Sequence, residues 1–237
     1  MILVGTSGWN YPHWKSVFYP PDLPSRSWLP FYAQKFSAVE VNYSFYRLPK
    51  TETYRKWFEQ TPEGFMFALK ASRFLTHVKR LKDARDALDI FLKNAASLGK
   101  KLGPIFFQLP PSFKANPKGL QEFLELLPKE GRFAFEFRHP SWFNEEVYAL
   151  LRRRNAALIA ADTPRYPYAE VRTADFFYLR LHGHEVLYAS SYSGKQLKEY
   201  ADKIREWGRG GDGFVFFDND FSGFAVENAL RLKKLLS

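Results

Sequence analysis

Eight short apolar segments recur along this chain of 237 residues, and most are followed by a stretch with the spacing of an amphipathic helix. The predicted strands cover residues 2–6, 38–42, 65–71, 105–109, 133–139, 157–161, 176–182 and 214–217. Alternating strands and helices form parallel sheets, because the crossover between parallel strands usually contains a helix. Eight such units in roughly 250 residues close into a (β/α)8 barrel. We therefore predict one α/β barrel domain of the TIM type over residues 1–237.

The connections between the strands support helices in most positions. The predicted N-cap residues, whose side chains accept hydrogen bonds from the first helical turn, are Asn116, Asn144, Ser193 and Ser222. The segment 163–175 contains Pro164 and Pro167 and has no helical periodicity. We therefore expect the sixth helix of the barrel to be weak or missing.

A doubly wound open sheet is the alternative architecture. That fold usually has a glycine-rich phosphate loop after its first strand. The residues Gly5-Thr6-Ser7-Gly8 do not match the G-x-G-x-x-G pattern, so the closed barrel is favoured.

The fifth strand, 133–139, indicates where a site would lie. Its apolar side chains Phe133, Phe135 and Phe137 share one face, and Glu136 and Arg138 lie on the other. In (β/α)8 barrels the site lies at the C-terminal ends of the strands. The polar residues at those ends are Glu40, Asn42, Lys70, Gln108, Glu136, Arg138, Asp162, Arg180, His182 and Asp218. A buried charge must be paired or used, so we predict a functional pocket, with an internal ion-pair network as the alternative.

Glu40 and Glu136 are the best candidates for general acid and base, because they stand on opposite sides of the predicted barrel mouth. The alternative is that nearby cations simply balance their charge. Lys70 and Asp218 complete the candidate catalytic set, and a desolvated Lys70 could also form a Schiff base. We expect Arg138 and Arg180 to clamp an anion.

The remaining candidates would bind substrate. Trp9, Tyr43 and Trp142 are predicted to stack on it. The other predicted binding residues are Asn42, Gln108, His139, Asp162, His182 and Asn219.

The residue types present exclude several chemistries. The chain has no Cys, so disulfides, thiolate metal ligands and Cys nucleophiles are excluded. His182-Gly183-His184 lacks the H-E-x-x-H spacing of a zinc helix, and we predict neither a metal nor a cofactor. No apolar run reaches the roughly 18 residues of a membrane span, and no signal peptide is apparent, so we expect a cytoplasmic protein without a membrane partner.

The net charge of +10 suits an anionic partner. A nucleic acid is one possibility, through the basic loop 70–82 and stacking aromatic residues. The alternatives are that the basic surface serves solubility, or that the barrel is a non-catalytic scaffold. We favour an enzyme acting on a small anionic or sugar-like ligand; the sequence makes no prediction of oligomeric state.

Seven motifs resemble a known family. They are Gly5-Thr6-Ser7-Gly8-Trp9, Val39-Glu40-Val41-Asn42-Tyr43-Ser44-Phe45-Tyr46, Phe67-Ala68-Leu69-Lys70-Ala71-Ser72-Arg73, Gln108-Leu109-Pro110-Pro111-Ser112-Phe113, Phe135-Glu136-Phe137-Arg138-His139-Pro140-Ser141-Trp142, Leu179-Arg180-Leu181-His182-Gly183 and Phe217-Asp218-Asn219-Asp220. Together they are similar to the YecE-like family, also called domain of unknown function 72. The resemblance covers essentially the whole chain. It implies a TIM-type barrel and no established activity.

Overall fold

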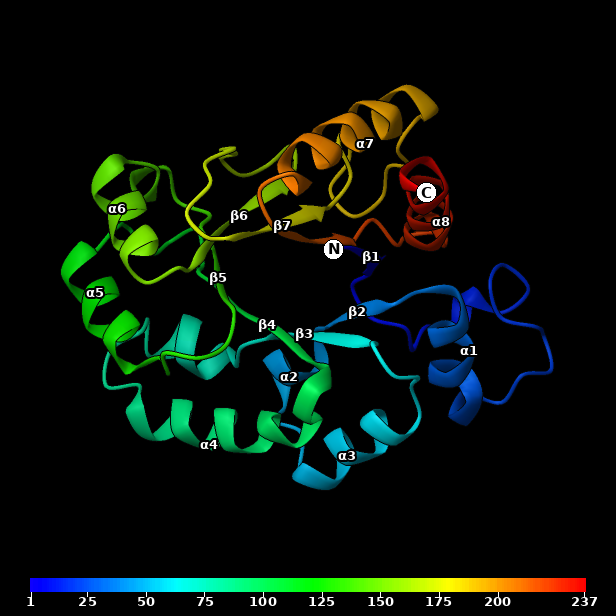
Figure 1. Ribbon diagram of the computed structural model, residues 1–237, viewed down its shortest axis with the longest axis horizontal. Helices are drawn as coiled ribbons and strands as arrows, with labels where there is room; N and C mark the ends of the chain where they lie inside the picture. Colours follow the sequence, from blue (N-terminus) through cyan, green and yellow to red (C-terminus); the bar gives the residue numbers. More distant parts are fainter.

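The computed structural model describes residues 1–237 and contains eight parallel strands arranged as a barrel (Figure 1). The strands neighbour one another in the order β1-β8-β7-β6-β5-β4-β3-β2. Their bounds are β1 Ile2–Thr6, β2 Ala38–Val41, β3 Met66–Lys70, β4 Leu102–Gln108, β5 Phe133–Glu136, β6 Ala157–Asp162, β7 Phe176–Leu181 and β8 Asp212–Phe217. The predicted fold class is confirmed.

Helices surround the sheet on its outer side (Figure 1). They are α1 Trp28–Lys35, α2 Tyr43–Tyr46, α3 Thr51–Glu59, α4 Arg85–Ala95, α5 Pro117–Leu126, α6 Glu145–Arg153, α7 Gly194–Gly208 and α8 Phe224–Leu236. No helix lies between β6 and β7, as the two prolines of that segment predict. None of the helices combines the length and the apolarity that crossing a bilayer requires.

The predicted helix starts are mostly confirmed. Asn116 accepts a hydrogen bond from Gly119 N, Asn144 accepts one from Val147 N, and Ser193 forms a capping box with Gln196. The last helix differs from the prediction. It follows Gly223, which has a φ of 78° and makes no side-chain cap, so Ser222 is not its N-cap.

The two faces of the sheet carry different residues. The outward side chains, among them Phe133 and Phe135, pack against the helices in a core of 52 buried residues. The inward side chains, among them Ala134, Phe106 and Phe214, fill the interior in a second core of 12 residues. The predicted alternation along the fifth strand is therefore confirmed, and polar residues occupy the inward positions nearest the C-terminal ends.

The seam between β1 and β2 has only an isolated bridge, between Ser7 and Glu40, and the side chain of Tyr32 reinforces it. The Tyr32 hydroxyl accepts hydrogen bonds from Thr6 N and Thr6 Oγ1, both at 2.9 Å, and lies 3.1 Å from the Ala38 carbonyl, to which it donates. A Cβ on Gly5 would lie 2.2 Å from the same carbonyl, so the close approach of the strands requires glycine here.

Replacing Tyr32 with phenylalanine is therefore expected to lower the free energy of unfolding by about 2 kcal/mol, because buried backbone groups lose their partner. Urea unfolding followed by circular dichroism measures this loss. Tyr148→Phe on α6 is the matched control, since the Tyr148 hydroxyl makes no hydrogen bond within the protein, and an equal effect of the two substitutions would contradict the role of Tyr32.

Candidate functional site

The buried guanidinium of Arg180 is the centre of the barrel mouth. Arg180 points inward from β7 and is fully buried. Its Nε and Nη2 donate to the two oxygens of Glu40 at 2.9 and 2.7 Å. Nη1 donates to Glu136, and Nη2 also contacts Asp218 at 3.1 Å. Three carboxylates from β2, β5 and the end of β8 thus converge on one cation.

Glu40 has no free acceptor position. Ser7 Oγ donates to one of its oxygens at 2.6 Å, and the Tyr178 hydroxyl donates to the other at 2.7 Å. Each oxygen also accepts from Arg180, and the side chain is fully buried. These contacts fix the orientation of Arg180 and leave Glu40 without an open face toward a ligand.

Glu136 is similarly engaged. Gln108 Nε2 and Arg138 Nε each donate to its Oε1 at 2.8 Å, and Arg180 donates to the other oxygen. Burial alone would raise the pKa of Glu136, but Arg180 and Arg138 outweigh it and hold this pKa well below its usual value. Glu136 is therefore a permanently ionised carboxylate, which is the opposite of what a general acid needs.

Asp218 and His182 form the part of this cluster nearest to β8. Asp218 keeps 19% of its side chain exposed, and its Oδ2 lies 3.0 Å from His182 Nδ1 without the alignment of a hydrogen bond. Burial raises the pKa of Asp218, but the opposing effect of His182 and Arg180 is larger, so the pKa of Asp218 lies below its usual value. Asp218 is thus an ionised carboxylate that remains accessible from the mouth.

Lys70 differs from every other charged residue of the mouth. It ends β3 and is 9% exposed, yet its ammonium group makes no hydrogen bond or ion pair. Nζ lies 4.3 Å from the centroid of the Phe45 ring. Burial and the charge of Arg180 lower the pKa of Lys70 to about 8, although the three carboxylates oppose the shift. A substantial fraction of Lys70 is therefore a neutral amine near physiological pH.

The mouth is electropositive beside β3 and β5. Burial and the cations Lys70, Arg73 and Arg138 lower the pKa of His77 to about 4. Arg138 is held in place by Glu136 and by the Tyr166 ring, whose centroid lies 4.5 Å from its Cζ. A guanidinium has five N–H donors, and only some of those of Arg138 make hydrogen bonds within the protein. Arg138 can therefore donate the others to an anion.

We call Glu40, Lys70, Gln108, Glu136, Arg138, Arg180, His182 and Asp218 the mouth cluster. The structure brings these eight predicted residues together. Trp9, Asn42 and Tyr43 lie beside the cluster and line a separate cleft.

Four predicted residues lie elsewhere, and these placements correct the sequence analysis. Trp142 is fully buried and stacks on Phe137 at 4.6 Å, so it cannot stack on a substrate. His139 accepts from Ser141 N and caps a short 3-10 turn.

Asp162 and Asn219 also face away from the barrel interior. The side chain of Asp162 points to the outer face of β6 and accepts a hydrogen bond from the Tyr192 hydroxyl at 2.8 Å. Asn219 Nδ2 donates to Ser190 O and to Asn228 Oδ1, both at 2.9 Å. These contacts join loops to helices and leave neither side chain in the mouth.

Several residues that shape the mouth were not predicted from the sequence. Tyr178 shares the inward face of β7 with Arg180, which is a signal that could have identified it. Ser7 continues the inward side of β1 after Leu3 and pairs with Glu40 in an isolated bridge, so the same alternation could have identified it. His77 carries no such signal, because it lies in a connection whose path depends on tertiary packing. His77 belongs to a π-helical turn, Phe74–Val78, within the basic loop.

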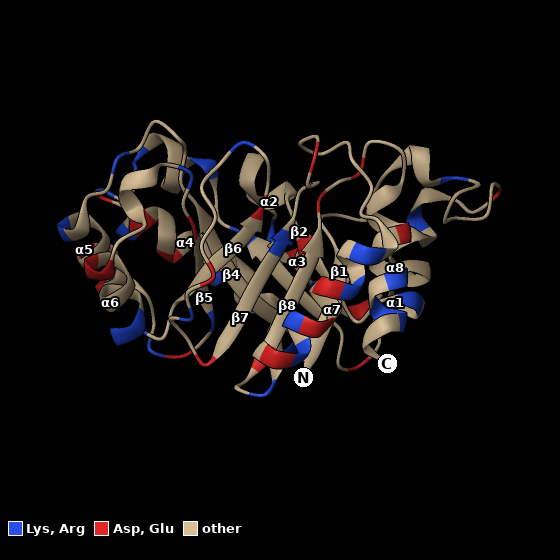
Figure 2. Cartoon of the chain, turned by 90° about the horizontal axis from the view of Figure 1, so that it is seen from above, with Lys and Arg blue, Asp and Glu red and all other residues tan.

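The remaining expectations concern metals and the basic surface. No three His, Cys, Asp or Glu side chains are grouped as metal ligands would be. Lys70 is directed into the mouth and is not part of the exposed basic loop. Figure 2 shows Lys and Arg interspersed with Asp and Glu on α7 and α8.

A nearly closed parallel barrel with a charged cluster at its C-terminal mouth defines the class of this protein as a (β/α)8 barrel protein. The chain belongs to the family described as "Protein of unknown function DUF72", whose model matches residues 3–237. The family resemblance found in the motifs is thereby confirmed.

The names of the relatives place them in one family and state no activity. The Escherichia coli K12 protein "UPF0759 protein YecE" is 33% identical over 155 residues, which cover 64% of this chain and 54% of the relative. The match thus spans about half the length of that protein. "UPF0759 protein YunF" of Bacillus subtilis is 26% identical over 270 residues, covering 100% of this chain and 95% of the relative.

Solved structures have the same fold. The DUF72 family protein TM1631 of Thermotoga maritima has a TM-score of 0.88 and 33% identity, covering 100% of this chain and 99% of that one. The Enterococcus faecalis protein EF0366 has a TM-score of 0.87 at 20% identity, covering 100% of this chain and 95% of that one, and shows the fold alone.

Proposed function

We propose that this protein is an enzyme that transfers protons to and from a small anionic or polyhydroxylated substrate, of the sugar or sugar-phosphate type, at the mouth of the barrel. The observation that carries the proposal is the unpaired ammonium group of Lys70, whose pKa is lowered to about 8. Perturbed lysines of this kind are typical of catalytic sites, because the neutral amine is a base and a nucleophile.

The contacts favour a different division of roles from the one that sequence analysis predicts. Glu40 and Glu136 have their oxygens engaged, and they orient Arg180 and Arg138. Lys70 is then the proton acceptor: its neutral Nζ takes a proton from the substrate, becomes an ammonium, and returns the proton to a second substrate atom.

The anionic part of the substrate has a matching partner. Arg138 is prearranged by Glu136 and Tyr166, and it stands in the electropositive part of the mouth. A planar guanidinium in this position suits a carboxylate or a phosphate. Asp218 is accessible enough to accept hydrogen bonds from substrate hydroxyls.

A thermal-shift screen at low and high salt tests this proposal with sugar phosphates, nucleotides and short oligonucleotides. A ligand that binds only the folded state adds about 2.7 kcal/mol of stability at a hundredfold excess over its dissociation constant. We expect a sugar phosphate to stabilise the protein at both salt concentrations, and Arg138→Met to reduce the shift. Stabilisation by oligonucleotides alone, lost at high salt, would favour the nucleic-acid hypothesis instead.

A further inference from the structure

Two lysines of this protein are buried, and only one of them has a partner for its ammonium group. Lys101 is 4% exposed and donates to the Thr61 carbonyl at 2.6 Å. Lys70 is 9% exposed and makes no hydrogen bond or ion pair. Buried polar groups in native proteins are normally paired, so the unpaired amine of Lys70 calls for an explanation.

The amine of Lys70 can be reached from the barrel mouth. Lys70 ends β3 on the inward side, two residues after Ala68 of the interior core. The buried side-chain nitrogens and oxygens without a partner are Asn42 Oδ1, Tyr54 Oη, His182 Nδ1 and Asn219 Oδ1. Lys70 Nζ also lacks a partner but is not among these atoms, so this nitrogen keeps accessible surface.

The surroundings of Lys70 hold the amine in place without neutralising it. The Lys70 carbonyl accepts a hydrogen bond from Ser44 Oγ at 2.7 Å, and Nζ lies 4.3 Å from the centroid of the Phe45 ring. The His77 ring meets Phe45 edge to face, with centroids 5.0 Å apart. The carboxylates of the mouth cluster all bond to Arg180 instead. Because burial lowers the pKa of Lys70 to about 8, the amine is a positioned nucleophile in its neutral form.

A group that can bind an anion lies in the same part of the mouth. Arg138 keeps 12% of its side chain exposed, and its Nε donates to Glu136 at 2.8 Å. Besides burial, the charges of Lys70 and Arg138 lower the pKa of His77, and both charges also act on Glu136. The amine and the guanidinium therefore face one small region. A molecule with an anionic group a few bonds from an electrophilic carbon matches this pair.

We infer that Lys70 is a site of reversible covalent modification, at which a small aldehyde that carries an anionic group forms an imine with Nζ and binds Arg138 through its anion. The Nζ lone pair forms a bond to the carbonyl carbon, and one electron pair of the C=O bond moves to the oxygen. The two protons of the amine leave with that oxygen as water, and the C=N bond remains. Asp218, an accessible carboxylate, can carry these protons from nitrogen to oxygen.

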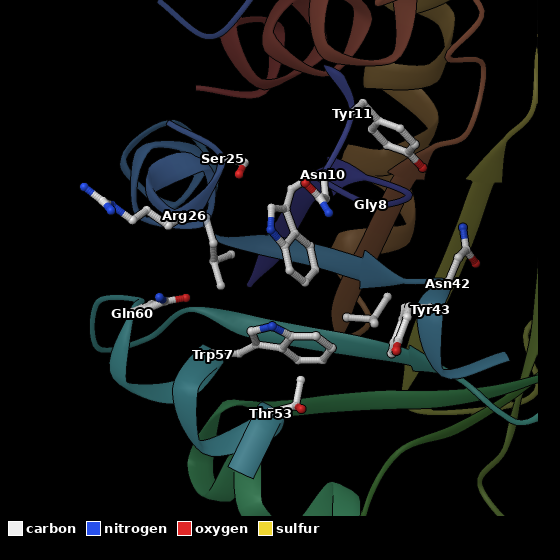
Figure 3. Close-up of a pocket in the computed structure, with 13 residues that line it drawn as sticks. Gly8, Asn10, Tyr11, Ser25, Arg26, Asn42, Tyr43, Thr53, Trp57 and Gln60 are labelled. Carbon is white, nitrogen blue, oxygen red and sulfur yellow. The ribbon is translucent and has the colours of Figure 1, made fainter. Parts of the chain in front are cut away.

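The inference rests on the proposed function for the anion-binding role of Arg138, and it adds a form of regulation. An imine on Nζ occupies the amine that the proposed reaction uses as its base, so an anionic aldehyde inhibits turnover. The cleft between α1 and α3, which Trp9 and Trp57 line, has a volume of about 580 Å³ but no lysine in its lining (Figure 3). An imine on Lys70 therefore reports on the mouth and not on this cleft.

Reductive trapping with sodium cyanoborohydride tests this inference, because it converts an imine into a stable secondary amine that peptide mass mapping locates. The probes are glyceraldehyde 3-phosphate and glyceraldehyde, which differ only in the phosphate. We expect the phosphate probe to modify Lys70 before any exposed lysine, and about tenfold faster than glyceraldehyde does, the usual effect of one charge-assisted hydrogen bond. Lys101 should stay unmodified. Arg138→Met is expected to remove the advantage of the phosphate and to leave the trapping of glyceraldehyde unchanged.

The matched control is Lys82→Met, which removes an exposed lysine of the loop after β3 and should leave the adduct on Lys70 unchanged. Three results would overturn the inference: no adduct on Lys70, modification of exposed lysines ahead of Lys70, or equal trapping of the two probes at Lys70. A thermal shift with a sugar phosphate that has no aldehyde, such as glucose 1-phosphate, does not depend on imine formation. The inference and the proposed function can therefore fail separately.

Discussion

Arg180→Met is expected to lower the free energy of unfolding by about 3–5 kcal/mol, which is the usual cost of removing one partner from a buried ion pair. The substitution leaves Glu40 and Glu136 in the barrel interior without their main counter-ion. Glu40 has no water to replace the lost hydrogen bonds, since it is fully buried. Urea unfolding monitored by circular dichroism measures the change.

Two further variants keep this prediction testable. Arg152→Met removes an exposed ion pair with Glu145 on α6 and is expected to cost no more than about 1 kcal/mol. Arg180→Lys retains the charge but not the two parallel bonds to Glu40, so we expect an intermediate loss. If Arg180→Met were as stable as Arg152→Met, the role of Arg180 as the organising cation of the mouth would be wrong.

Lys70→Met is expected to reduce turnover of the substrate identified by ligand screening by about 10²–10⁴-fold, the usual contribution of a general base. Stability should be retained, because the ammonium of Lys70 has no ion pair to lose. In the wild type, kcat/KM should rise with pH and level off, with the midpoint of the rise at about pH 8. This follows because Lys70 accepts a proton only when neutral and its pKa is about 8.

Lys82→Met is the matched control for this experiment. Lys82 is an exposed lysine that follows the same strand, so its replacement removes the same charge without entering the mouth. We expect unchanged turnover and an unchanged pH profile. Full activity of Lys70→Met would contradict the assignment of Lys70 as the base, even if the substrate binds in the mouth.

The barrel, and the gathering of charged side chains at its mouth, were predictable from the sequence. The alternation of apolar segments and helical patterns predicts a parallel sheet. Every second residue of each strand faces the barrel interior, and the polar residues at these positions form most of the mouth cluster. Glu136 and Arg180, for example, follow directly from the alternation on β5 and β7. What could not be predicted is how the carboxylates share Arg180, because β2, β5 and β7 are not neighbours in the sheet.

The misplaced residues have local physical causes. In β6 the run Ala157-Leu158-Ile159-Ala160-Ala161 is apolar at every position, so the pattern does not reveal that Asp162 faces outward. Trp142 follows a strand end, as a substrate-stacking residue would, but the 3-10 turn at Pro140–Trp142 directs it onto Phe137. The cleft beside α1 and α3 depends on how two helices pack, and no sequence pattern encodes that angle.

The most direct test of the central claim is an NMR titration of protein labelled with carbon-13 at the lysine ε positions. The resonance of Lys70 is identified by its absence from the Lys70→Met spectrum. We predict that this resonance titrates with a midpoint at about 8, well below the value of 10.5 that is usual for lysine. A Lys70 midpoint at or above that usual value would show an ordinary, permanently charged lysine and would contradict the proposed chemistry of the mouth.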